Sequence, residues 1–213
     1  MVGIGITTLN RPDHLGYCLK MHEDFSGYDL MHVSKGEGGI SQKKNESLKI
    51  LQDCDYVFLF DDDCFPIREG WEQFFIGHSL RSGQQHFMYM NGVWVKKVED
   101  GIGYYDHCQG VMLFMTKKCI ESVGGFSPNF KKYGFEHANY SDRIHAAGLT
   151  PKGKYSCPVD AFNYIYSLDL DNWNPTINKQ LNHKPSLSSV EALWSVNKQM
   201  EVYKSDKTLF YPL

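Results

Sequence analysis

The sequence predicts an α/β fold with a mostly parallel central sheet flanked by helices. Two segments, residues 2–8 and 56–60, are short and continuously apolar, which is typical of strands buried on both faces. Helical spacing of apolar residues follows the first segment and precedes the second, and such alternation favours parallel pairing of the strands. With 213 residues, of which 42% are hydrophobic, the chain suits one compact domain.

The first predicted unit is a strand at residues 2–8, a polar loop and a helix that begins near Pro12. Proline is favoured in the first turn of a helix because the N–H that it lacks would have no partner there. A second unit follows, with a strand at residues 28–33 and a helix for which Ser41 is the expected N-cap. Each helix would then lead back to the start of the next strand.

The rest of the chain has weaker periodicity. Asn91-Gly92 separates two apolar segments and predicts a hairpin turn, because both residues tolerate positive φ. The helix that begins at Glu136 is expected to stop at Gly148. The other expected elements are strands at residues 87–90, 93–95 and 110–116 and helices at residues 136–147 and 190–203.

Composition and charge exclude several classes of protein. The formal net charge of -3 provides no general basic field for nucleic acid. No apolar run approaches the roughly 20 residues that cross a bilayer, and the first residues do not resemble a secretion signal. The six cysteines include no Cys-x-x-Cys pair, so they indicate neither a zinc site nor a disulfide framework. We therefore expect a cytoplasmic protein without a membrane span.

Three adjacent carboxylates, Asp61, Asp62 and Asp63, directly follow the apolar segment at residues 56–60. Adjacent carboxylates repel one another, so a fold that holds them together needs a compensating cation. Taken alone, such a triplet is usually a solvated acidic loop. Its position at the end of a buried strand, where open α/β sheets bind ligands, favours a divalent metal that is shared with a diphosphate. The expected cofactor is Mn²⁺ or Mg²⁺.

Short motifs occur in a definite order along most of the chain. They are Ile-x-Ile-Thr-Thr-Leu-Asn-Arg-Pro at residues 4–12, Gly-Ile-Ser at 39–41 continuing to Asn45, Phe-Leu-Phe-Asp-Asp-Asp-x-x-Pro at 58–66, Gly-Gly-Phe at 124–126, and Tyr-Gly-Phe-Glu at 133–136 with Arg143 and Gly148 after it. Each motif is weak by itself, but the ordered set, over roughly residues 2–148, resembles the family 2 glycosyltransferases.

This resemblance implies a GT-A (Rossmann-like) nucleotide-diphospho-sugar transferase fold and metal-dependent transfer of a sugar from a nucleotide-sugar donor, most often a UDP-sugar, to an acceptor hydroxyl. It implies a single domain over residues 1–213, with a nucleotide-binding half at about 1–66, an acceptor-side half at about 67–168 and a C-terminal tail and helix at about 169–213. Metal ligands would be Asp61, Asp63 and a late histidine, His183. The implied donor-binding residues are Thr7, Thr8, Asn10, Arg11, Lys43, Lys44, Asn45, Asp61 and Asp62.

The resemblance also implies a catalytic base on the acceptor side. An inverting transfer needs a group that takes the proton of the acceptor hydroxyl. The family's usual Glu-Asp pair is Glu136-His137 in this chain, so Glu136, His137 or Asp142, one turn along, would serve as the base. Retention of configuration, which needs no such base, stays open.

Other functions compete with this interpretation. Gly3-x-Gly5 lies within the first strand rather than after it, which argues against a dinucleotide-binding oxidoreductase, and a Walker loop is missing. A nucleotidyltransferase acting on a sugar phosphate and a non-catalytic domain that binds a carbohydrate or another partner remain alternatives.

The acceptor stays open among a glycan, a lipid-linked sugar, a protein and a hydroxylated base of phage-type DNA. Trp94 and Tyr105 are candidates for stacking on a sugar or a base. If DNA were the acceptor, six lysines would contact its phosphates: Lys96, Lys97, Lys117, Lys118, Lys131 and Lys132.

Overall fold

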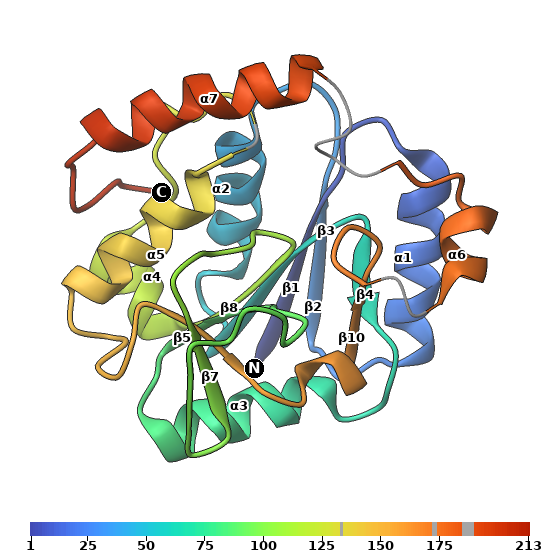
Figure 1. Cartoon of the computed structure of the whole chain (residues 1–213), viewed down its shortest axis with the longest axis horizontal. Coiled ribbons are helices and arrows are strands. Elements are labelled where there is room, and N and C mark those ends of the chain that lie inside the picture. The colour runs from blue at the N-terminus through green and yellow to red at the C-terminus, as the bar shows by residue number, and fades with distance from the viewer. Residues whose placement is uncertain (133, 172–173, 185–189) are drawn as a thin grey trace.

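The computed structural model describes residues 1–132, 134–171, 174–184 and 190–213 (Figure 1). Its centre is a five-stranded sheet in the order β2-β1-β3-β8-β5. Strands β1 (Val2–Thr7), β2 (Leu30–Ser34) and β3 (Tyr56–Asp61) pair in parallel. Strand β8 (Met112–Thr116) pairs antiparallel with both β3 and β5 (His86–Met88). Only β8 therefore runs against the other strands of this sheet, which confirms the predicted, mostly parallel α/β arrangement.

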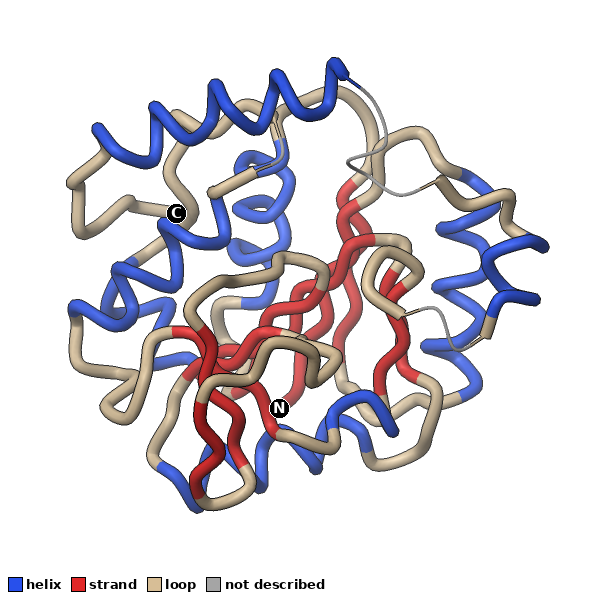
Figure 2. Tube along the Cα trace, viewed as in Figure 1, coloured by secondary structure: helices blue, strands red, loops and turns tan. Residues whose placement is uncertain are grey.

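Helices flank the sheet, as Figure 2 shows. Helix α1 packs against β4 (Cys64–Pro66), and α2 packs against β1 and β2. Pro12 occupies the first turn of α1, as predicted. The helices are α1 (Pro12–Asp24), α2 (Ile40–Leu51), α3 (Trp71–Ser82), α4 (Lys117–Val123), α5 (Glu136–Ala146), the short 3₁₀ turn Ala161–Asn163, α6 (Pro175–Gln180) and α7 (Val190–Ser205). Within the described residues, a helix with the length and apolar character of a bilayer span is not found.

Two small sheets accompany the central one. Strand β4 pairs antiparallel with β10 (Ile165–Ser167), and β7 (Ile102–Tyr105) lies between β6 (Lys97–Glu99) and β9 (Tyr155–Pro158). The β4–β10 pairing brings the polar segment after β10 beside the end of β3.

The predicted hairpin at Asn91-Gly92 is wrong. Strand β5 ends at Met88, and residues 93–95 are not a strand. The hairpin instead joins β6 to β7 through Asp100 and Gly101, whose φ angles are 52° and 75°. A two-residue turn with positive φ at both positions fits the twist of an antiparallel pair, and Asp-Gly is among the sequences that favour it.

Helix α2 begins two residues earlier than its predicted N-cap, Ser41, implied. Gly39 is the N-cap, and Ser41 lies in the first turn, where its buried hydroxyl lacks a partner in the described structure. A Cβ at Gly39 would lie only 2.7 Å from the carbonyl oxygen of Lys131. The close approach of this backbone therefore requires glycine and fixes where the helix begins.

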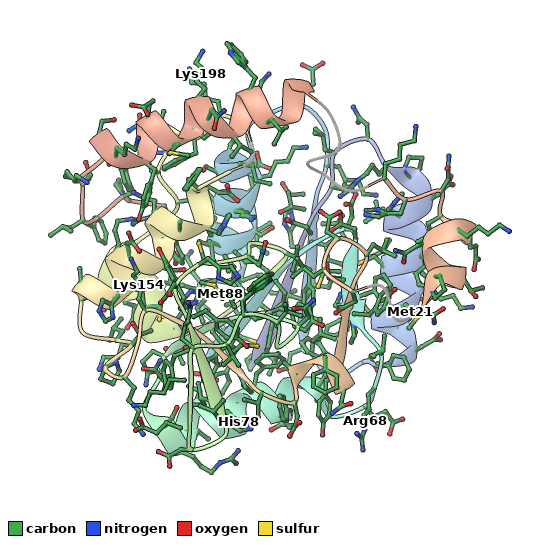
Figure 3. All side chains as sticks on the ribbon, in the orientation of Figure 1. Met21, Arg68, His78, Met88, Lys154 and Lys198 are labelled. Atoms are coloured by element: carbon green, nitrogen blue, oxygen red, sulfur yellow. The ribbon has the colours of Figure 1, made fainter. Side chains whose placement is uncertain are left out.

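The core is aromatic on the face of β3 that α3 covers. The ring centroids of Phe58 and Trp71 lie 4.7 Å apart at a steep angle, and Phe60 packs edge-on against the same indole at 5.5 Å. Figure 3 shows how densely side chains fill the interior around Met88, whereas Arg68 and Lys198 lie at the periphery. This packing holds β3 rigidly, so the three carboxylates that follow it leave the sheet at a fixed place.

Candidate active site

The acidic triplet lies at the carboxyl end of β3, beside the end of β1. Thr7 pairs with Asp61, and the amide of Asp62 donates to the carbonyl of Thr7. The hydroxyl of Thr8 donates to the carboxylate of Asp62, whereas the buried hydroxyl of Thr7 finds no partner among the described residues. Asn10, the next predicted donor contact, is exposed and has a φ of 53°. The loops that follow β1 and β3 therefore form one hydrogen-bonded unit.

Arg11 supplies much of the positive charge that the triplet needs. One guanidinium nitrogen lies 2.8 Å from Asp63, and the other bonds to Asp62. Burial opposes the charge of Arg11, but the carboxylates of Asp63 and Asp62 outweigh it and raise the arginine pKa. Asp62 is fully buried, with both carboxylate oxygens directed at Thr8 and Arg11. Asp62 thus organises the loop, and its contact with a donor stays a prediction.

Lys44 supplies the second internal cation. Its ammonium is 1% exposed and lies 3.0 Å from Glu136 and 3.6 Å from Asp61. Burial disfavours this charge, yet Asp61 and Glu136 together raise the lysine pKa. Burial and the neighbouring carboxylates raise the pKa of Asp61 to about 7, although Lys44 opposes the shift. Lys44 therefore bridges the end of β3 and the start of α5.

Two further predicted donor residues on α2 make internal bonds. The ammonium of Lys43 is buried and donates to the carbonyl of Thr8 at 2.7 Å. The amide of Asn45 donates to the carbonyl of Phe126 and accepts from its N–H. These contacts position the first loop and the turn after α4, and direct contact of either residue with a nucleotide is still untested.

A candidate metal centre lies beside the triplet. Ligand atoms of Asp63, Asp169 and His183 all lie within 4.8 Å of one another. The second oxygen of Asp63 is buried and has no hydrogen-bond partner in the described part of the chain. One ring nitrogen of His183 lies 2.8 Å from a carboxylate oxygen of Asp169. The other ring nitrogen lies 3.2 Å from a ring nitrogen of His14. Carboxylate oxygens and an imidazole nitrogen suit Mn²⁺, so this donor set fits the expected cofactor.

The predicted metal ligands are therefore only partly brought together. Asp63 and His183 join this cluster, and Asp61 lies outside it. Asp169 was not predicted, because a single aspartate in a polar segment carries no local signal. It reaches the site because Leu168 donates its amide to the carbonyl of Asp63, next to the β4–β10 pairing.

Glu136 is the first residue of α5. One carboxylate oxygen accepts from the amide of Gly134 at 2.9 Å, and the other lies near Lys44 and 3.4 Å from the ring of His137. Burial alone would raise the pKa of Glu136, but Lys44 and His137 hold it well below its usual range. Conversely, Cys108 and Glu136 overcome the effect of burial and raise the pKa of His137 to about 10.

Asp142, the third predicted base, makes its contacts away from the acidic triplet. Its carboxylate accepts hydrogen bonds from the hydroxyls of Tyr155 and Tyr203 and lies 2.9 Å from the ammonium of Lys154. Lys154 is labelled in Figure 3, near α5. Asp142 therefore joins α5 to β9 and α7. Tyr133, part of the motif before Glu136, lies outside the described residues.

The DNA hypothesis gains no support. Three of the six predicted phosphate contacts already lie near carboxylates, as Lys96 does at 3.1 Å from Asp106. Lys97 pairs with Glu99, and Lys117 lies 3.8 Å from Asp53. These exposed pairs are ordinary surface interactions.

Comparisons with known proteins agree with the fold. The chain is 28% identical over 144 residues to an uncharacterized glycosyltransferase of Acanthamoeba polyphaga mimivirus, which covers 62% of this chain and 56% of the relative. The chain thus spans about half the length of that relative. No family model matches the sequence.

Several solved structures share the fold at low sequence identity. The catalytic domain of Drosophila β1,4-galactosyltransferase 7 with xylobiose gives a TM-score of 0.55 at 14% identity, over 89% of this chain and 83% of that one. TarS of S. aureus with UDP gives 0.56 at 11%, over 97% and 72%. The mannosyltransferase PcManGT of Pyrobaculum calidifontis, with GDP-Man and Mn²⁺, gives 0.51 at 10%, over 98% and 76%. This likeness shows that the chain has the GT-A fold.

Proposed function

We propose that this protein is a glycosyltransferase that uses a divalent metal to transfer a sugar from a nucleoside-diphosphate sugar to an acceptor hydroxyl. The observation that carries the proposal is the cluster of Asp63, Asp169 and His183 at the carboxyl edge of the sheet. Support comes from the mimivirus relative and from neighbours solved with UDP or with GDP-Man and Mn²⁺. The division into a donor half before about residue 66 and an acceptor half after it belongs to the same proposal.

Asp63, Asp169 and His183 would hold the metal, and we expect Mn²⁺ to suit them better than Mg²⁺ because of the histidine nitrogen. A bound divalent ion would neutralise the charge that develops on the departing nucleoside diphosphate. Arg11 adds a fixed cation beside Asp63, and its side chain is 33% exposed, so it can reach a phosphate. The loop from Thr7 to Arg11 would receive the nucleoside, which we expect to be uridine.

We assign the role of catalytic base to Glu136 in an inverting transfer. His137 stays protonated near neutral pH because its pKa is raised to about 10, so it cannot accept a proton. Asp142 contacts Tyr155, Tyr203 and Lys154, whereas Glu136 shares Lys44 with Asp61 at the end of β3. Glu136 is ionised, as a base must be, although its low pKa makes it a weak one. It would accept the proton only as the acceptor oxygen bonds to the anomeric carbon.

The test is turnover of a panel of UDP-sugars and GDP-mannose with Mn²⁺, followed by detection of the released nucleotide. Asp63→Asn should lower turnover by roughly 100-fold or more, because a metal supplies several kcal/mol of charge stabilisation. Asp24→Asn, at the exposed end of α1, is the matched control and should turn over normally. Proton NMR of the first product should show inverted anomeric configuration.

Other outcomes identify the competing functions. Release of pyrophosphate from a nucleoside triphosphate and a sugar phosphate would make the protein a nucleotidyltransferase. If neither hydrolysis nor transfer of any donor occurs and Mn²⁺ does not promote nucleotide binding, a non-catalytic binding domain replaces the proposal.

A further inference from the structure

An exposed apolar group lies on the segment that joins β5 to the β6–β7 hairpin. Trp94 is 74% exposed, and its neighbours Val93, Val95 and Val98 are 49%, 38% and 54% exposed. The backbone of Trp94 has a φ of 68°, a strained conformation that is rare for a bulky residue. Such strain persists only where surrounding contacts fix the backbone, and it concentrates at functional sites.

Contacts on both sides of Trp94 provide this fixation. The side-chain amide of Asn91 donates to the carbonyl of Leu170 at 2.6 Å. After the tryptophan, the amide of Lys96 donates to the carbonyl of Tyr104 at 2.9 Å, so the chain is tied to β7. The backbone is therefore held at two points while the indole between them stays largely uncovered.

This segment begins at the same edge of the sheet as the acidic triplet. Strand β5 runs in the same direction as β3, because both pair antiparallel with β8. Met88, at its carboxyl end, lies level with Leu59 of β3, because both pair with Leu113 of β8, and Asp61 follows two residues after Leu59. The anchor of Asn91, Leu170, directly follows Asp169 of the metal cluster. In Figure 1, the segment between β5 and β8 crosses in front of the central sheet.

We propose that Trp94, with Val93, Val95 and Val98, is a platform on which a pyranose ring of a glycan acceptor stacks. An indole face matches the C–H face of a pyranose, and nearby polar groups can bind the hydroxyls at its rim. A DNA backbone would instead need free cations, and the two lysines of this segment, Lys96 and Lys97, already pair with Asp106 and Glu99. The inference rests on the proposed function and deepens it, because it identifies the acceptor as a carbohydrate.

The experiment is saturation-transfer NMR of the full chain with methyl β-pyranosides of xylose, galactose, glucose and mannose, in the presence of UDP and the diamagnetic ion Mg²⁺. At least one pyranoside should bind the unaltered protein through its C–H protons. Trp94→Ala should weaken that binding about tenfold, and Trp94→Phe should recover part of it because the ring remains. Trp194→Ala is the matched control: Trp194 is 65% exposed on α7, where Lys198 lies over its ring, and its loss should change nothing.

Each of the remaining outcomes contradicts either the platform or the proposed function. If UDP and Mn²⁺ raise the melting temperature but none of the four pyranosides binds, the platform is wrong and the proposed function survives. Equal binding by the Trp94→Ala variant, or equal loss in the Trp194→Ala control, also overturns it. Binding of a duplex that contains hydroxymethylcytosine, lost in Trp94→Ala, would transfer the acceptor role to DNA. Failure of UDP and Mn²⁺ to bind at all would remove the proposed function itself.

Discussion

His22 is a fully buried histidine whose two ring nitrogens have no hydrogen-bond partner within the described residues. It lies among aromatic rings, with Phe60 at 4.7 Å and Trp71 at 5.9 Å between centroids. Burial lowers its pKa from 6.5 to about 3. The folded protein therefore holds this imidazole neutral over a pH range in which the unfolded chain protonates it.

This difference predicts that acid destabilises the protein through His22. Because the folded pKa is depressed, the unfolded state binds more protons between pH 6.5 and 3, and stability falls as pH decreases through this window. The contribution of His22 amounts to about 2.5 kcal/mol between pH 7 and 4.5. Urea unfolding at the two pH values should show this loss in the unaltered protein and a correspondingly smaller loss in His22→Phe. An unchanged pH dependence in the variant would contradict the assignment.

His86 serves as the comparison for this prediction. Burial lowers its pKa to about 4, against the opposing effect of the Phe114 carbonyl. Its ring nitrogens bond to that carbonyl and to Ser141, so a variant at this position would lose hydrogen bonds as well. Only His22→Phe therefore separates the proton linkage from the loss of bonded partners.

At the level of single residues, the sequence predicted Asp61, Asp63 and His183 as metal ligands, and the structure brings Asp63 and His183 together. It could not identify Asp169, because the pairing of β10 with β4 that delivers it depends on contacts distant in sequence. The negative charge of the triplet is also balanced by other cations than the sequence predicted. Arg11 and Lys44 neutralise much of the triplet internally, so the metal hypothesis depends on Asp63 rather than on all three carboxylates.

Among the elements, α2, β3 and α5 are joined by the buried ammonium of Lys44. Lys44→Met would leave Asp61 and Glu136 without this cation in a buried site, which should cost about 3–5 kcal/mol. Glu136→Gln should cost less, since Asp61 still pairs with Lys44. The double variant should be more stable than the sum of the two losses predicts, by about 1–3 kcal/mol. Urea unfolding of the four proteins measures this coupling.

An exposed ion pair provides the control for this cycle. Lys152 lies 2.6 Å from Asp100, with side chains 32% and 68% exposed. Its cycle, with Lys152→Met and Asp100→Asn, should show a much weaker coupling, because water and salt screen an exposed pair. If the Lys44 and Glu136 cycle gave no more than this surface pair, the buried bridge would not join α2 to α5.

The packing and pairing of the elements explain which of them the sequence could predict. Residues 56–60 form a buried strand because a continuous run of apolar side chains is stable only when both faces are removed from water. The packing of Phe58 and Phe60 on Trp71 agrees with this. The hairpin was misplaced because Asn91-Gly92 and Asp100-Gly101 carry the same turn signal. Strand pairing with β9, from a distant part of the chain, selects the second site.

For the whole molecule, the proposed metal would connect parts that are far apart in sequence. Asp63 follows β3, Asp169 follows β10, and His183 follows α6. In the unfolded chain these ligands are dispersed, so a metal and a nucleotide should bind the folded state almost exclusively. Binding of this kind stabilises a protein by about 2.7 kcal/mol when the ligand is at 100 times its Kd.

This linkage gives a prediction for the melting temperature. UDP with Mn²⁺ at such a concentration should raise it by roughly 5–10 °C for a chain of this size, and EDTA should reverse the rise. His183→Gln and Asp63→Asn should lose most of the shift because each removes a ligand, whereas Asp24→Asn should keep it in full. Scanning calorimetry with and without EDTA measures all four proteins. A full shift in the Asp63→Asn variant, or one that survives EDTA, would show that UDP binds without a metal at this edge of the sheet.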